Sequence, residues 1–151
     1  MNINIPPIEN EKSVAKLMYG LHRLLGGLKN EAFSKEGISF PQTLILGFLK
    51  HNEERKINMK SLQEVLHIKA SSVTSLVDTM QKNGLIEREQ NPNDARENLI
   101  KLTEKGKIMA EKVESILEDM DEKAFSVLSK KETTTLRNLL LKVINGLKEE
   151  K

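Results

Sequence analysis

The sequence contains no cysteine. Without one, the chain forms no disulfide, offers no thiolate to a metal, and cannot sense an oxidant through a thiol of its own. No apolar run approaches the roughly 18 residues that suggest a membrane span. The first ten residues lack the basic and then apolar stretches of a secretory signal. We therefore expect a soluble, cytoplasmic protein.

Motifs of common enzymes are missing as well. The chain has no H-E-x-x-H, no glycine-rich phosphate loop and no G-x-S-x-G. Its three histidines lie far apart, at His22, His51 and His67, and none forms an i, i+4 ligand pair. We predict no catalytic residue, no metal site and no cofactor, and an enzyme is the least favoured class.

Charge is nearly balanced along the chain. The 151 residues, enough for one domain with a real core, carry a net charge of +2. Residues 57–101 hold six Lys or Arg and six Asp or Glu, so that region is neutral. Any affinity for phosphate must therefore come from the placement of a few charges.

Apolar residues at helical spacing predict a mainly α-helical chain with a small β-hairpin. We expect a first helix over residues 8–33, weakened near its end by Gly26 and Gly27. Ser39 to Gln42 reads as a capping box that opens a second helix, ending near Asn52. Asn58 is the expected N-cap of a short helix through Leu66.

A further helix is predicted from about Lys69 to Asn83. Its apolar face consists of Val73, Leu76, Val77 and Met80. Its other face carries small polar side chains: Ser71, Ser72, Thr74, Ser75 and Asp78. Gly84 follows as the residue that most easily ends a helix.

Residues 85–102 predict a β-hairpin. Leu85 to Gln90 alternates apolar and charged residues, and Asn98 to Leu102 reads as the returning strand. Asn91-Pro92-Asn93-Asp94 supplies the turn between them.

Two more helices complete the chain. Thr103 is the expected N-cap of a long connecting helix over 103–128, and Ser129 to Glu132 forms another capping box. The last helix, over 129–149, is strongly apolar at Leu136, Leu139, Leu140, Val143, Ile144 and Leu147.

Two short helices, a tight turn and a hairpin make a winged helix-turn-helix. The second of the two helices needs one buried face to hold it rigid and one small polar face to approach the major groove. Its hydroxyls can donate to phosphate oxygens or base edges. Arg96, near the hairpin tip, is placed to enter a minor groove.

Three motifs follow one another at fixed spacing after the helix that contains Ser72, namely G-L-I-E-R at residues 84–88, Asp94-Ala95-Arg96, and L-T-E-K-G at residues 102–106. In these motifs and in the layout of the flanking helices the chain resembles the MarR family over nearly its whole length. The resemblance implies a transcriptional regulator, expected to be a repressor on a palindromic operator. It implies recognition-helix contacts from Lys69, Ser71, Ser72, Thr74 and Ser75, and a wing arginine at Arg96 supported by Asp94 and Arg88.

The wing departs from the family at Ala95, where many members carry a second basic residue. Residues 85–101 hold four acids and three bases. We therefore expect modest wing affinity with a real dependence on Arg96. Lys60, Lys69 and Lys82 are candidates for phosphate contacts. Taken singly, the serines and the threonine of the predicted recognition helix would be ordinary solvated residues, and Asp94 and Arg96 could simply stabilise a turn by an ion pair. The combination at fixed spacing favours DNA contacts instead.

The first and last helices are expected to form a homodimer. They carry more apolar surface than one small chain can cover, although packing within one subunit is the alternative. A two-fold dimer would read two half-sites about 34 Å apart. The expected organisation is one chain with dimerisation helices at 8–33 and 129–149, a DNA-binding lobe at 39–102 and a connecting helix between.

Sensing stays open at this level. The absence of histidine from residues 103–128 argues against the zinc sites of some relatives, so a small-molecule effector or none remains. Tyr19, His22, Phe48 and Met109 could line an effector pocket, or could simply be core residues. The competing function is a winged-helix protein-interaction module that binds no specific DNA, which the neutral charge of residues 57–101 favours slightly.

Overall fold

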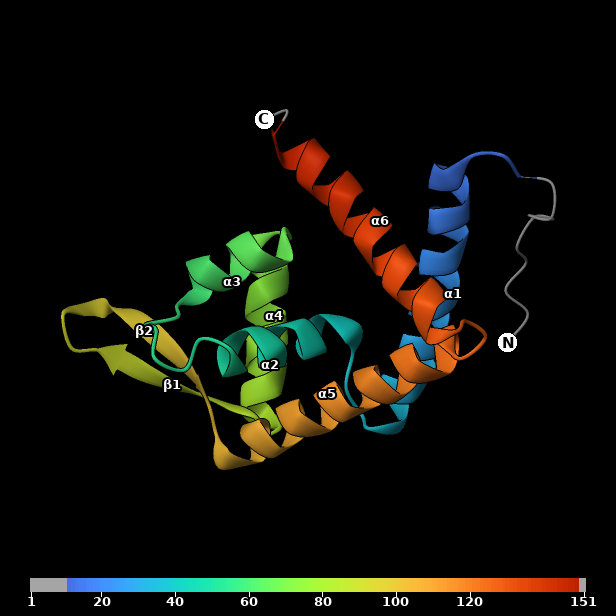
Figure 1. Ribbon diagram of the computed structural model, residues 1–151. Coiled ribbons are helices and arrows are strands. Elements are labelled where there is room, and N and C mark those ends of the chain that lie inside the picture. Colours follow the sequence, from blue (N-terminus) through green and yellow to red (C-terminus); the bar gives the residue numbers. More distant parts are fainter. Residues whose placement is uncertain (1–10, 150–151) are drawn as a thin grey trace. The chain divides into compact units, whose positions relative to one another are not determined.

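The computed structural model describes residues 11–149, apart from the side chains of Ala95 and Arg96. The elements run in the order α1 (Val14–Lys35), α2 (Phe40–Lys50), α3 (Met59–Leu66), α4 (Ala70–Lys82), β1 (Ile86–Asn91), β2 (Asp94–Leu102), α5 (Glu104–Phe125) and α6 (Lys130–Glu149). This mainly helical chain with one antiparallel hairpin confirms the predicted fold class (Figure 1). It divides into two compact units after Leu117, within α5.

Helix α1 begins later than predicted. Ser13 is its N-cap, with extended backbone and a hydroxyl that accepts a hydrogen bond from the Lys16 amide at 3.4 Å. The helix therefore starts at Val14 and not at Ile8, and residues 8–10 lie outside the described part. It ends at Lys35, beyond the predicted end at residue 33. The chain leaves the helical direction at Gly37, whose φ is +68°, a conformation that glycine adopts easily.

The predicted caps of the later helices are confirmed. Ser39 and Gln42 form the capping box of α2, and the Asn58 side chain accepts a hydrogen bond from the Ser61 amide at 2.8 Å. The Thr103 hydroxyl accepts one from the Gly106 amide at 3.0 Å. Each cap satisfies a backbone donor that the first turn of a helix leaves free.

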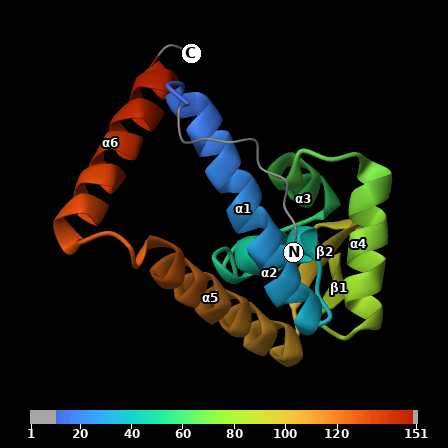
Figure 2. The same ribbon diagram turned by 90° about the vertical axis from the view of Figure 1, so that its right-hand side faces the viewer.

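In the first unit, helices α2, α3 and α4 gather near the hairpin (Figure 2). The hairpin tip extends away from these helices (Figure 1). The core lies among these elements, the end of α1 and the start of α5. Its largest fully buried side chains are Phe33, Ile45, Leu46, Leu62, Val73, Val77, Met80, Ile86 and Ile100. Burial of this apolar surface holds the helix-turn-helix as one rigid body.

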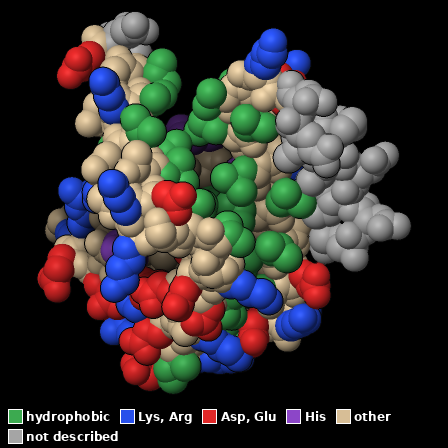
Figure 3. All heavy atoms as spheres, turned by 45° about the vertical axis from the view of Figure 1, so that its right-hand side comes forward, with side chains coloured by type: hydrophobic (Ala, Val, Ile, Leu, Met, Phe, Trp, Pro, Cys, Tyr) green, Lys and Arg blue, Asp and Glu red, His purple; other side chains and the backbone are tan. Residues whose placement is uncertain are grey.

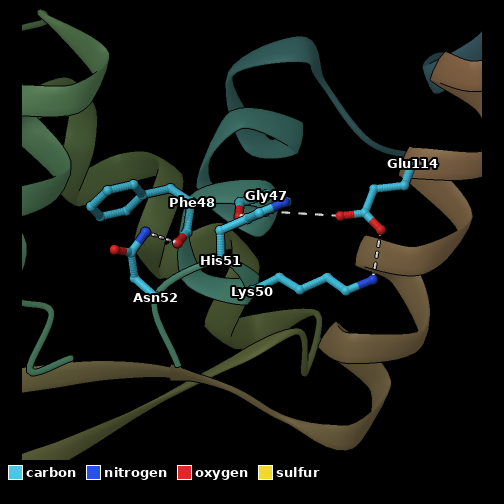
Figure 4. Close-up of polar contacts among 6 residues, drawn as sticks. All are labelled: Gly47, Phe48, Lys50, His51, Asn52 and Glu114. Atoms are coloured by element: carbon cyan, nitrogen blue, oxygen red, sulfur yellow. Dashed lines mark hydrogen bonds and ion pairs between the residues drawn. The ribbon is translucent and has the colours of Figure 1, made fainter. Parts of the chain in front are cut away.

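The C-terminal end of α2 is tied to α5. Lys50 Nζ donates to Glu114 Oε2 at 2.6 Å, and His51 Nδ1 lies 3.9 Å from Glu114 Oε1 (Figure 4). The hydrogen bond with Glu114 raises the pKa of Lys50 above its ordinary value. His51 Nδ1 also lies 2.8 Å from the Gly47 carbonyl, which helps satisfy the last turn of α2.

The backbone of α5 at Gly106 lies directly against the backbone of Leu85. A Cβ placed on Gly106 would lie 1.8 Å from the Leu85 carbonyl oxygen, far inside van der Waals contact. The absence of a side chain therefore lets the first turn of α5 rest on the chain entering the hairpin. Gly84, the residue before Leu85, has a φ of +71° and follows the end of α4, as predicted.

The second unit contains the end of α5 and all of α6. The Ser129 amide and hydroxyl both donate to Glu132 Oε2, at 2.8 and 2.7 Å, which confirms the predicted capping box. These bonds lower the pKa of Glu132. Within the described chain, α6 buries none of its residues. No helix among residues 11–149 is both long enough and apolar enough to cross a membrane.

Candidate nucleic-acid interface

A tight turn joins α3 to α4. His67 adopts the left-handed conformation, with φ 51° and ψ 37°, and its amide donates to the Gln63 carbonyl at 3.0 Å. Histidine is among the residues that tolerate this region better than most. Lys69 follows as the N-cap of α4, with extended backbone. The predicted helix-turn-helix is therefore present, with its reversal centred on His67.

Helix α4 has two sharply different faces. Val73, Val77 and Met80 are at most 1% exposed, and Leu76 packs against them half-buried. The predicted contact residues Ser71, Ser72, Thr74 and Ser75 are all exposed. The alternation follows from the helical repeat, because residues three and four apart share a face. The buried face anchors the helix and leaves the small polar face free.

The hydroxyls on this face differ in availability. Thr74 Oγ1 donates to the Ala70 carbonyl of its own helix at 3.0 Å. The side chains of Ser71, Ser72 and Ser75 make no hydrogen bond with the described part of the chain. These three serines are therefore the α4 hydroxyls that can turn freely toward a ligand.

The hairpin forms the wing. Its strands pair from Ile86 with Leu102 to Gln90 with Asn98, after which the register shifts and Asn91 faces Asp94. Arg96 belongs to β2 by its backbone, but its side chain lies outside the described residues. Asp94, expected to support the tip, is exposed at the start of β2. The predicted location of the wing is thus correct, with an irregular tip.

Arg88 links the wing to α4. Its guanidinium Nη2 donates to Asp78 Oδ1, and the two side chains are 28% and 56% exposed. The sequence assigned Arg88 a supporting role near the tip and placed Asp78 on the polar face of α4. Nothing in the sequence indicated that the two meet, since they lie on different elements.

The acids of the wing are largely engaged within the protein. Glu89 forms an ion pair with Lys101 across the strands. Glu97 accepts hydrogen bonds from the side-chain amides of Asn58 and Asn91. Glu87 is exposed and forms no ion pair with the described residues. A count of charges along the sequence treats these acids alike, whereas the structure separates them.

Three lysines were expected to contact phosphates. Lys60, Lys69 and Lys82 are all exposed, and none is paired with an acid in the described part of the chain. Lys60 lies in the first turn of α3, Lys69 precedes α4 and Lys82 ends it. Their ammonium groups are therefore free for an anionic partner.

The four predicted effector-pocket residues divide into two kinds. Tyr19, which is 64% exposed, and His22 lie on the surface of α1. Phe48 of α2 and Met109 of α5 are half-buried and pack against the core. Phe48 and Met109 are therefore core residues, the alternative to an effector pocket. Tyr19 and His22 are not core residues.

Comparison with known proteins agrees with this geometry. The MarR family model matches residues 36–97. The HTH-type transcriptional regulator MgrA of Staphylococcus aureus is 33% identical over 124 residues, which cover 81% of this chain and 80% of MgrA. MgrA is a transcriptional regulator, the class of protein that the sequence predicts.

Solved structures share the fold over most of the chain. A cysteine-to-serine mutant of MarR from E. coli has a TM-score of 0.78 and 28% identity, covering 87% of this chain and 96% of its own. The same mutant complexed with operator DNA has a TM-score of 0.70 and 26% identity, covering 92% and 99%. The wing, the recognition helix α4 and these relatives together establish that the chain belongs to the MarR family of winged helix-turn-helix, DNA-binding transcriptional regulators.

Proposed function

We propose that this regulator is a repressor that binds a palindromic operator as a homodimer. The observation that carries the proposal is α4, whose hydroxyl face is exposed while its opposite face packs into the core. A helix held in this way can enter a major groove and present hydroxyls to base edges and phosphates. The similar E. coli protein crystallised with operator DNA supports the same mode of binding.

Exposed apolar side chains support the homodimer. On α1 they include Val14, Leu17, Met18 and Leu21, and on α6 Leu139, Val143, Ile144 and Leu147. Hydrophobic side chains reach the surface in Figure 3. A second copy of the chain would cover them, since exposed apolar surface of this extent marks an interaction site. It would also supply the second recognition helix that a palindrome requires.

Sedimentation velocity tests the dimer. Leu139→Glu combined with Ile144→Glu should convert the protein to monomer, because each places a charge in an apolar interface. Asn138→Glu, at an exposed polar position of the same helix, is the matched control and should stay dimeric. A double variant that sediments like the wild type would exclude α6 from the interface.

Binding to duplex DNA tests the repressor. The dimer should prefer a palindromic site near its own gene to random duplex, and its affinity should fall steeply as salt rises. Arg96→Ala should weaken binding while fold and dimer are kept, and Arg96→Lys should retain part of the affinity because it keeps the charge. Unchanged affinity of Arg96→Ala would remove this residue from the interface.

The alternative is a protein-interaction module, favoured by the neutral charge of residues 57–101. A dimer that binds palindromic and random duplex equally weakly, with little salt dependence, would support this alternative and defeat the repressor proposal.

We include a small-molecule effector in the proposal, with Tyr19, His22, Phe48 and Met109 as its candidate contacts. An effector releases such a protein from DNA only if it binds two dimer arrangements with different affinity. A thermal-shift screen of small organic compounds, followed by competition against DNA, would identify one. A compound that stabilises the wild type but not Tyr19→Ala would place the site at α1.

A further inference from the structure

We propose that Glu97 is a positioning residue, whose carboxylate fixes the wing against α3 and so strengthens DNA binding. The inference rests on the proposed contact between wing and DNA. It reverses what charge alone suggests, since an acid in the wing should repel phosphate.

The strand ladder is interrupted where Glu97 lies. Gln90 faces Asn98 and Asn91 faces Asp94, so residues 95–97 of β2 have no partner in register on β1. This stretch also contains the backbone of Arg96, the expected minor-groove residue. Without regular pairing the segment has no ladder to set its position. The side-chain hydrogen bonds of Glu97 hold one end of this stretch.

The Glu97 carboxylate connects two elements. One oxygen, Oε1, accepts from Asn58 Nδ2, and the other, Oε2, accepts from Asn91 Nδ2. Asn58 caps α3 through its Oδ1, which accepts from the Ser61 amide. The Oδ1 of Asn91 accepts from the Asn93 amide at 3.0 Å, within the hairpin turn. One carboxylate thus joins the start of α3 to the tip of the wing.

Only an acid fits between these two amides. Each asparagine has its oxygen committed to a backbone amide and offers Glu97 a donor, so the residue between them must accept on both sides. A carboxylate does this, whereas a glutamine side chain has one acceptor and one donor. Asn91 is 8% exposed, so a donor left facing its amide would be poorly solvated.

The base of the wing is held independently. The Ile100 amide donates to the Ile57 carbonyl at 2.7 Å, and Asn58 forms a backbone bridge with Leu99. These backbone contacts stay when the carboxylate is removed. We therefore expect Glu97→Gln to loosen the wing tip and to leave the fold intact.

The decisive comparison is Glu97→Gln against Glu87→Gln. Both remove one negative charge from the same hairpin, but Glu87 is exposed and unpaired among the described residues. Glu87→Gln should bind DNA as tightly as the wild type or slightly tighter. Glu97→Gln should bind roughly three- to tenfold more weakly, the effect of losing one ordinary hydrogen bond. Equal or tighter binding by Glu97→Gln would overturn the proposal.

A charge-conserving swap provides the rescue. In the double variant Asn91→Asp and Glu97→Gln, the new carboxylate at position 91 accepts from the new amide at position 97. The oxygen of the amide side chain at position 97 still accepts from Asn58. The net charge of the double variant equals that of the wild type. Affinity should return to within about twofold of the wild type. A double variant as weak as Glu97→Gln would overturn the role of the hydrogen bonds.

Hydrogen exchange of the amides of residues 91 and 93–97 reports on the wing without DNA. Exchange should be faster in Glu97→Gln, and near the wild-type rate in Glu87→Gln and in the swap. Unchanged exchange in Glu97→Gln would overturn the proposal whatever the DNA result. Failure of the wild type itself to bind duplex DNA, with exchange as expected, would defeat the proposed DNA contact and keep the positioning of the wing by Glu97.

Discussion

Arg88 of β1 and Asp78 of α4 form an ion pair, which joins the wing strand to the exposed side of the recognition helix. Glu97 provides a second connection, from β2 to the N-cap of α3. The wing is therefore bonded to both helices of the helix-turn-helix. These side chains hold in one geometry the two elements, wing and α4, that we propose to contact DNA.

Breaking the Arg88–Asp78 pair should lower the stability of the fold only slightly. The loss of affinity for DNA should be larger. Arg88→Ala and Asp78→Ala should each lower the free energy of unfolding by less than about 1 kcal/mol, since the pair is partly exposed. A double-mutant cycle in urea should give a coupling of roughly 0.5 kcal/mol. A coupling of zero would contradict the ion pair.

Removing a lysine that we propose to contact phosphate should weaken binding to all sequences alike. Because the proposed dimer carries each lysine twice, Lys60→Ala and Lys82→Ala should each lower the slope of log affinity against log salt by about 2, while the preference for the operator is unchanged. Lys101→Ala is the control, because Lys101 is already paired with Glu89. An unaltered slope would exclude the lysine concerned.

The contact of Gly106 with Leu85 leaves no room for a methyl group. Gly106→Ala should lower the free energy of unfolding by about 3 kcal/mol or more, because the backbone of two elements must move apart. Gly47→Ala in α2 is the matched control. Its Cβ meets open space, so it should stabilise by about 0.5–1 kcal/mol through helix propensity. Urea unfolding at pH 7 distinguishes the two, and an unchanged midpoint for Gly106→Ala would refute the close contact.

The Lys50–Glu114 pair predicts a pH dependence. The pKa of Lys50 is raised in the folded protein, chiefly by its hydrogen bond with Glu114, so the folded state holds this proton more tightly than the unfolded chain. Its stabilisation is complete below the ordinary pKa of 10.5 and is lost as pH rises through the folded value.

Thermal unfolding checks this dependence with Lys50→Met. The variant should unfold at most about 3 °C below the wild type from pH 7 to 9, and the gap should close above pH 10.5. Lys56→Met removes an exposed lysine that forms no pair with the described residues, and it should show no such closing gap. A gap that persists at high pH would assign the loss to packing instead.

Local rules predicted the elements well because each depends on neighbours in sequence. The two faces of α4 follow from its helical repeat, and the caps at Ser39, Asn58 and Thr103 from hydrogen bonds within four residues. The start of α1 was misplaced because an apolar pattern does not show where the backbone first turns helical. Only the Ser13 hydroxyl, bonded to the Lys16 amide, marks that point.

The connections of the wing could not be predicted in the same way. Asp78 and Arg88 meet across a helix and a strand, and Asn58 and Glu97 are separated by 39 positions. Such pairs depend on tertiary packing, which no spacing rule contains. The sequence therefore identified Glu97 as one more negative charge, and only its two amide partners indicate a structural role.

The balanced charge of residues 57–101 bears on how such a regulator distributes itself over a genome. Affinity for arbitrary DNA comes almost entirely from phosphate contacts and the counterions they release. A lobe with six cations and six acids has little excess charge with which to hold random sequence. For the operator that we propose, fewer molecules would then be retained by the millions of competing sites, and fewer copies in the cell would be needed to occupy it.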